Sequence, residues 1–371
     1  MIPFSDPSAS YQAHKSEIDR AIKRVLDSGW YVLGTEVDAF EKEFTSFHGK
    51  DFYAVGVANG TDAIALCLRG LGLGTGDEII TTSHTAVATV AGIEQAGCTP
   101  VFADIDPNTR CIDPKSIEER VGYNTRAIMP VHIYGQPAEM QKILEVANFH
   151  NLAVIEDCSQ AHGAEIQGKK VGTFADFSAY SCYPTKNLGG TGDGGVILCR
   201  SKEFSEKIRS LRQYGWNEAR ESIIPGFNSR LDEMQATILR VKLRHLSDDN
   251  EKRRLIAQRY NHAFQDLPIT LPYQKSNEMH AMHLYVIECE RRNELLKYLR
   301  SKGIGASLHY PQAVHQHAAY ANRIRGGDDL PMTEHFYQKN LTLPMFPELS
   351  EEKLQHVIYS LTSWFKNGNY P

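Results

Sequence analysis

Short apolar segments alternate with helix-like patterns along the first half of the 371-residue chain, and this alternation limits the fold more than any other feature. Segments of this length, separated by helical patterns, are typical of buried parallel strands joined by covering helices. We therefore predict an α/β fold with a mostly parallel central sheet. The apolar segments are residues 53–57, 78–81, 100–103, 127–131, 152–155 and 196–199.

Helical patterns lie before and after this region. Residues 14–28 carry apolar side chains on one helical face and are followed by Gly29, a residue that commonly ends helices. The charged segment 232–264 predicts a long connecting helix. A strand over 284–289 and helices near 291–302 and 350–365 follow. We predict a large domain over residues 1–245 and a smaller α+β domain over residues 246–371.

Composition excludes several classes of protein. The net charge of −5 and the isoelectric point near 6.3 argue against a nucleic-acid or anionic-membrane surface. The seven cysteines are odd in number and scattered, as expected in a reducing compartment. No apolar segment is long enough to span a membrane, and the first residues do not resemble a signal peptide. We expect a cytoplasmic protein without nucleic-acid or membrane partners.

One acid and one lysine have the pattern of a cofactor site. Asp157 ends an apolar strand, where open α/β sheets bind their ligands, although strand-end acids are also common turn residues. Lys186 lies between Pro184 and a run of glycines, in a loop where many lysines are merely solvated. Together they supply an amine and a carboxylate, the pair that pyridoxal 5′-phosphate (PLP) requires.

The segment Asn59-Gly60-Thr61-Asp62 joins a predicted strand to a helical pattern. Glycine permits close backbone approach, and the free amides of a helix start attract anions, so this segment is a candidate phosphate site. An ordinary helix cap by Asn59 or Thr61 explains the same residues equally well.

Two further motifs invite other interpretations. Residues 190–195 match the dinucleotide fingerprint G-x-G-x-x-G, but they lead into an apolar segment instead of opening a helix. Three histidines lie within residues 309–317, but their spacing fits no zinc signature. We therefore expect neither a nicotinamide cofactor nor a metal ion.

The chain resembles the DegT/DnrJ/EryC1/StrS family of nucleotide-sugar aminotransferases over nearly its whole length. The resemblance implies an aspartate-aminotransferase-like fold (fold type I) and a homodimer with active sites at the subunit interface. The matching segments are residues 28–34, 58–63, 76–80, 131–136, 156–164, 181–190 and 226–233.

The resemblance also implies roles for single residues. Lys186 would form the Schiff base with PLP and carry the proton between substrate and cofactor. Asp157 would pair with the pyridinium nitrogen, and Gln160 would contact the ring hydroxyl.

The same resemblance implies a phosphate site shared between two subunits. Gly60, Thr61 and Ser181 would hold the phosphate, and Asn228 of the other subunit would assist. Many relatives carry a large aromatic residue at the position of Ala86, so we predict that His84 stacks on the cofactor ring instead.

The form of residues 83–89, Ser-His-Thr-Ala-Val-Ala-Thr, resembles that of family members that aminate C3 of a dTDP-3-keto-6-deoxyhexose. Tyr183, His309 and Tyr310 are then candidates for contacts to the sugar, with L-glutamate as amino donor. Amination at C4 is the main alternative. A 3-dehydratase, which has histidine at the position of Lys186, a non-enzymatic regulatory protein and an NAD-dependent oxidoreductase are more distant ones.

Overall fold

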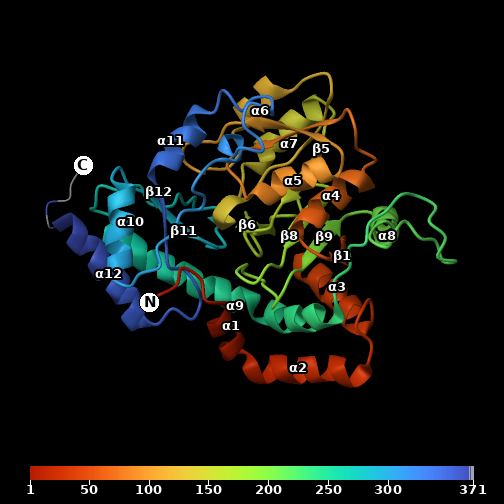
Figure 1. Ribbon diagram of the computed structural model, residues 1–371, viewed down its shortest axis with the longest axis horizontal. Coiled ribbons are helices and arrows are strands. Elements are labelled where there is room, and N and C mark those ends of the chain that lie inside the picture. The colour runs from red at the N-terminus through yellow and green to blue at the C-terminus, as the bar shows by residue number, and fades with distance from the viewer. Residues whose placement is uncertain (367, 369–371) are drawn as a thin grey trace.

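The computed structural model describes residues 1–366 and 368 of the chain (Figure 1). Neighbouring strands of the central sheet are parallel from β3 to β8, whereas β9 is antiparallel to both of its neighbours. The predicted α/β fold with a mostly parallel sheet is therefore confirmed. Within the described residues this sheet has seven strands, in the order β1 (Tyr53–Val57), β9 (Gly195–Cys199), β8 (Phe177–Ser181), β5 (Ala153–Asp157), β4 (Thr125–Ile128), β2 (Glu78–Thr82) and β3 (Thr99–Ala103).

Helices connect and cover these strands. The predicted first amphipathic helix is α2, and Gly29 ends it in the left-handed conformation with φ of 67°, which glycine adopts without steric cost. The other helices of this part are α1 (Pro7–Ala13), α3 (Thr35–His48), α4 (Gly60–Gly70), α5 (Val87–Gln95), α6 (Pro114–Arg120), η1 (Ile133–Gly135), α7 (Met140–Phe149) and α8 (Lys202–Leu211), with α2 spanning Lys15–Ser28.

The long helix α9 (Glu233–Phe264) runs from the central sheet to the C-terminal part of the chain (Figure 1). There β11 and β12 form an antiparallel pair covered by helices. A small separate sheet joins β10 to β6 and β7. These elements are β6 (Glu165–Ile166), β7 (Lys169–Lys170), β10 (Glu278–Met279), β11 (Tyr285–Glu288), α10 (Arg292–Ser301), η2 (Val314–Gln316), α11 (Pro331–Lys339), β12 (Asn340–Leu343) and α12 (Glu351–Lys366).

Helix α9 contributes to two large hydrophobic cores and to a small one that it shares with α2. Its first half, up to Leu246, packs with residues of α3 and the sheet, whereas its second half, from Ile256, packs with β11, β12 and α12. Ile2 also joins the C-terminal core. The predicted domain boundary between residues 245 and 246 stays a prediction. Among the described residues, no helix combines the length and apolar character needed to cross a membrane.

The start of α3 is capped by a side chain from a distant part of the sequence. Gly34 precedes α3 and has no side chain to accept the first amides of the helix. The buried carboxylate of Glu233, in the first turn of α9, accepts three backbone hydrogen bonds instead. The donors are the amides of Gly34 (2.8 Å), Glu36 (2.9 Å) and Val37 (2.8 Å).

We expect Glu233→Ala to lower the free energy of unfolding by about 3 kcal/mol, because it leaves the buried amide of Val37 and the partly buried amides of Gly34 and Glu36 without an acceptor. Glu251→Ala, on the exposed face of the same helix, removes only an ion pair with Arg254 and should cost less than about 1 kcal/mol. Urea unfolding followed by circular dichroism measures both. Equal losses in the two variants would contradict the capping role.

Candidate active site

A cavity of about 250 Å³ lies at the carboxyl ends of β5 and β8, beside the first turn of α4. Open α/β sheets place their ligands at this edge. The cavity brings together most residues predicted for the cofactor site. Its lining consists of Asn59, Gly60, Thr61, Ile64, Thr85, Ala86, Ala88, Thr89, Val131, Asp157, Ser159, Gln160, Ser181, Tyr183, Lys186 and Asp193.

Lys186 lies in a tight loop after β8. Its amide donates to the carbonyl of Tyr183 at 2.8 Å, and a Cβ atom at Gly189 would lie 2.5 Å from the Pro184 carbonyl oxygen, so only glycine fits there. Burial lowers the pKa of the Lys186 amine to about 8, although the charge of Asp157 opposes this effect. The amine is therefore far more available as a neutral nucleophile than that of a solvated lysine.

Asp157 is buried at the end of β5, and its carboxylate is held in place by two donors. The hydroxyl of Thr89 donates to Oδ2 at 2.8 Å, and the amide of Ser159 donates to Oδ1 at 3.1 Å. Thr89 is itself 2.6 Å from the hydroxyl of Thr85. Thr89 was not predicted for the site. It lies in the first turn of α5 and is the last residue of the segment 83–89, which was compared with the family above.

The start of α4 has the features of an anion site. Asn59 caps the helix by accepting the amide of Asp62 at 2.8 Å, so the capping interpretation of this segment is confirmed, whereas its phosphate role stays a prediction. The earlier amides of a helix have no intrahelical acceptor, and Gly60 and Thr61 line the cavity. A Cβ atom at Gly60 would lie 2.6 Å from that of Ser181, so the glycine allows β8 to approach the helix start.

The Gln160 side chain connects the cavity to the segment around residue 310. Its Oε1 accepts the amide of Tyr134 at 2.7 Å, and its Nε2 donates to the hydroxyl of Tyr310 at 2.9 Å. One hydrogen on Nε2 remains free for a ligand, because a primary amide has two. Burial raises the pKa of Tyr310 to about 12, so this phenol stays protonated.

The prediction that His84 stacks on a cofactor ring is wrong. The His84 ring is completely buried in an aromatic cluster with Tyr134, Phe336 and Tyr337, and its Nδ1 lies 3.1 Å from the Tyr337 hydroxyl. The cluster holds the ring away from the cavity lining, to which its segment contributes small side chains such as Ala86 instead.

Of the remaining residues predicted for the site, one lines the cavity and three lie outside its lining. Tyr183 lines the cavity and is 53% exposed, so it can reach a bulky ligand. His309 bonds to Thr342 at 2.9 Å and lies near enough to Lys186 for the lysine charge to help burial lower its pKa to about 4. Neither His309 nor Tyr310 is part of the cavity lining. Asn228 is exposed and lies outside the cavity of its own chain, so its role across a dimer stays a prediction.

A hydrogen-bond network that sequence reasoning missed anchors the lysine loop. The side-chain Nδ2 of Asn187 donates to Oδ1 of Asn250 in α9 and to the backbone carbonyl of Ala281, at 2.8 Å each. Its oxygen lies 3.1 Å from Nδ1 of His283. The lysine loop is thereby tied to the connecting helix and to the segment before β11. Partners this distant in sequence give no local signal.

The two other motifs are accounted for by the fold. The glycine run at residues 190–195 leads into β9 and opens no helix, as expected. The histidines of residues 309–317 have separate partners. His315 contacts Ser83 at 2.8 Å and Glu334 at 3.3 Å, whereas His317 lies 3.4 Å from the Gln312 carbonyl oxygen.

We expect Asp157→Asn to lower the pKa of the Lys186 amine below its value of about 8, because the charge of Asp157 raises it. The measurement is an NMR titration of ¹³C-methylated lysines in protein freed of bound small molecules. Lys186→Arg assigns the signal, and exposed Lys142 is the internal control. An unchanged or higher pKa in the Asn variant would mean that the two groups do not interact.

Comparison with known proteins identifies close relatives of this chain. It is 42% identical to dTDP-3-amino-3,6-dideoxy-alpha-D-galactopyranose transaminase of Aneurinibacillus thermoaerophilus, covering 98% of this chain and 99% of the relative. It is 41% identical to dTDP-3-amino-3,4,6-trideoxy-alpha-D-glucose transaminase of Streptomyces venezuelae, covering 98% and 96%.

Solved structures agree with this relationship. Streptomyces venezuelae DesV in complex with a ketimine intermediate superposes with a TM-score of 0.95 at 41% identity, covering 98% of each chain. NtdA of Bacillus subtilis with bound cofactor PMP gives a TM-score of 0.87 at 31% identity, covering 95% of this chain and 82% of NtdA. The aspartate-aminotransferase-like fold is confirmed. Residues 12–362 match the family profile, and the chain belongs to the DegT/DnrJ/EryC1/StrS aminotransferase family.

Proposed function

We propose that this enzyme is a PLP-dependent aminotransferase of nucleotide-linked ketosugars. The observation that carries the proposal is the meeting of Lys186 and Asp157 in one cavity beside the start of α4. A buried amine of lowered pKa, an oriented carboxylate and free helix amides are three separate requirements of PLP chemistry. The family and the relative with bound PMP, the amine form of PLP, support the same cofactor.

The residues of the cavity fit this cofactor in size and charge. The volume of about 250 Å³ suits a pyridine ring with its phosphate. The α4 start and Ser181 would receive the phosphate, and Asp157 the ring nitrogen. When bound, PLP supplies an electron sink for the carbon that loses its proton.

The proton that leaves the amino-acid carbon is transferred by a residue of the chain. With a pKa of about 8, Lys186 can accept a proton from the amino-acid carbon and return one to the sugar carbon near neutral pH. Thr89 and Ser159 keep the Asp157 carboxylate fixed while this happens. Neutral His309 and Tyr310 add no competing charge near the amine.

The substrate we propose is a dTDP-3-keto-6-deoxyhexose, aminated to dTDP-3-amino-3,6-dideoxyhexose with L-glutamate as donor. Two relatives with more than 40% identity are named for dTDP-3-amino sugars, which supports C3 as the site. The cavity is smaller than pockets for drug-sized ligands, so the nucleotide must extend beyond it, past exposed Tyr183.

We further propose a homodimer with shared active sites, in which Asn228 serves the partner's cavity. Its exposure and its absence from the cavity of its own chain are consistent with that role. A cytoplasmic location is supported by the cysteines, all of which are buried and unpaired in the structure.

The substrate proposal is tested with dTDP-3-keto- and dTDP-4-keto-6-deoxyhexoses, each offered with L-glutamate. We expect amination at C3, identified by NMR of the product, and no detectable turnover by Lys186→Ala. Lys142→Ala, a change of a surface lysine, should retain full activity. Amination only at C4 would overturn the C3 assignment and leave the aminotransferase assignment intact. No turnover of either ketosugar by protein with bound PLP would exclude both.

Mixed dimers test the shared site. If Asn228 acts across the interface, a dimer of one Asn228→Ala chain and one Lys186→Ala chain has one intact site. Random pairing of the two variants should then recover about a quarter of the wild-type activity. Mixtures that never exceed the activities of the parent variants would place Asn228 outside the partner's site.

A further inference from the structure

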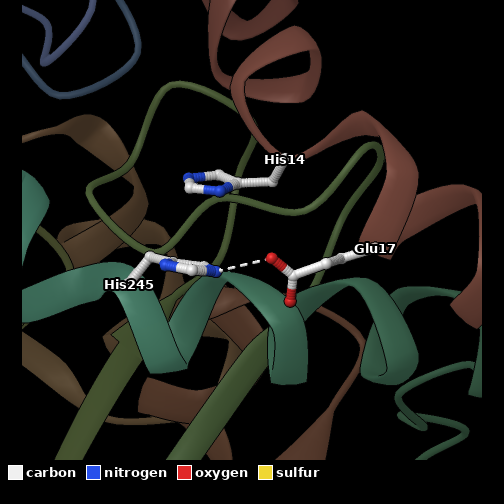
Figure 2. A group of neighbouring side chains, drawn as sticks. All are labelled: His14, Glu17 and His245. Atoms are coloured by element: carbon white, nitrogen blue, oxygen red, sulfur yellow. Dashed lines mark hydrogen bonds and ion pairs between the residues drawn. The ribbon is translucent and has the colours of Figure 1, made fainter.

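A second group of chemically reactive side chains lies where the N-terminal helices pack on α9 (Figure 2). It consists of His14, which joins α1 to α2, Glu17 in the first turn of α2, and His245 on α9. One ligand atom of each residue lies within 4.8 Å of the others. None of the three lines the cavity of Lys186.

The helices impose this grouping. His14 and Glu17 are three residues apart at the start of α2, and His245 and Asp249 are four residues apart on α9. Residues with these spacings lie on one face of a helix. Because α2 packs along α9, the two pairs face each other across the contact, and each helix contributes a histidine and a carboxylate.

The side chains of this cluster are in direct contact with one another. The two imidazole rings are stacked with their centroids 4.0 Å apart and their planes 14° apart. Nε2 of His245 lies 3.1 Å from Oε1 of Glu17. Nε2 of His14 is buried without a hydrogen-bond partner and lies 3.7 Å from Oδ2 of Asp249.

We propose that His14, Glu17 and His245 bind one divalent transition-metal ion, with zinc as the best match. Two imidazole nitrogens and one carboxylate oxygen form a donor set that suits zinc, with water completing the coordination. Zinc bonds of about 2.1 Å need donor atoms roughly 3.5 Å apart. Because the two rings are stacked and an imidazole lone pair lies in the plane of its ring, at least one ring must turn out of the stack for both nitrogens to face one ion.

Asp249 would orient His14 without binding the ion itself. With Nε2 of His14 turned toward Asp249, Nδ1 is the atom left to bind the ion. A carboxylate on the far nitrogen orients a metal-binding histidine and raises its basicity. Asp249 is itself held by Lys252, which donates to Oδ1 at 2.9 Å. Burial and the neighbouring His245 lower the pKa of His14, and a metal ion binds the neutral form of the ring.

The ion would join the N-terminal helices to α9 without taking part in the transfer of the amino group. Each partner on α9 is more than 220 residues from its partner on α2 along the chain. Binding there stabilises only the folded protein, because the unfolded chain does not hold these residues together.

The test is isothermal titration of the metal-stripped, PLP-loaded protein with Zn²⁺. All seven cysteines are buried, so they do not compete. We expect a single equivalent per chain in the wild type. His245→Gln, and His14→Phe, which keeps a stacked ring, should weaken binding by more than 100-fold, and Asp249→Asn by about 10- to 100-fold. His262→Gln removes an exposed histidine of the same helix and should bind like wild type.

Thermal unfolding provides the second measurement. Zn²⁺ should raise the melting temperature of the wild type and of His262→Gln, and leave that of His245→Gln unchanged. Absorbance of the bound cofactor shows whether each variant is folded. Wild-type protein that binds no Zn²⁺ at micromolar concentrations, or a folded His245→Gln variant that binds it equally well, would overturn the proposal. Neither result depends on which sugar the enzyme aminates.

Discussion

The active site depends on the hydrogen bonds of one carboxylate, that of Glu156, which is buried near the end of β5. It accepts the amides of Gly172 (2.7 Å), Phe174 (2.8 Å) and Ala175 (2.8 Å). Nε2 of His132 donates to it at 3.1 Å, because Nδ1 of that ring accepts the Ala138 amide. A buried carboxylate is tolerated only with such complete pairing. Since successive side chains of a strand point to opposite faces, fixing Glu156 on one face turns Asp157 toward the cavity on the other.

Two neighbouring acids therefore serve different purposes because their surroundings differ. Glu156 is surrounded by amides that the loop after β7 supplies, and it organises the backbone. Within the described part of the chain, the Asp157 carboxylate accepts hydrogen bonds from Thr89 and Ser159 alone, and its charge raises the pKa of Lys186. The amine keeps a pKa of about 8 because burial outweighs this attraction. A more exposed lysine would stay protonated, and one without a nearby carboxylate would lose its proton still more readily.

The parts that sequence predicted correctly are those with local signals. Apolar segments located β1, β2 and β5, and spacing located α2 with its end at Gly29. Strand β8 was missed, because its sequence Phe-Ser-Ala-Tyr-Ser has small polar residues between the apolar ones. His84 was misplaced for a different reason. Nothing near it in sequence indicates that Phe336 and Tyr337, more than 250 residues away, pack around its ring. The capping of α3 by Glu233 could not be predicted for the same reason, because Glu233 is almost 200 residues away from the amides that it accepts.

Helix α9 explains why these long-range contacts matter together. Glu233 at its start caps α3, His245 in its middle meets the N-terminal helices, and Asn250, just beyond, bonds to Asn187 of the lysine loop and to the carbonyl of His162. Its last turns belong to the C-terminal core. One continuous helix thus carries contacts to the N-terminal helices, to the lysine loop and to the C-terminal core. The lysine loop is therefore anchored by an element that also contacts the N-terminal helices and the C-terminal core, whereas the groups that line the cavity come from loops, strand ends and the N-terminal parts of α4 and α5.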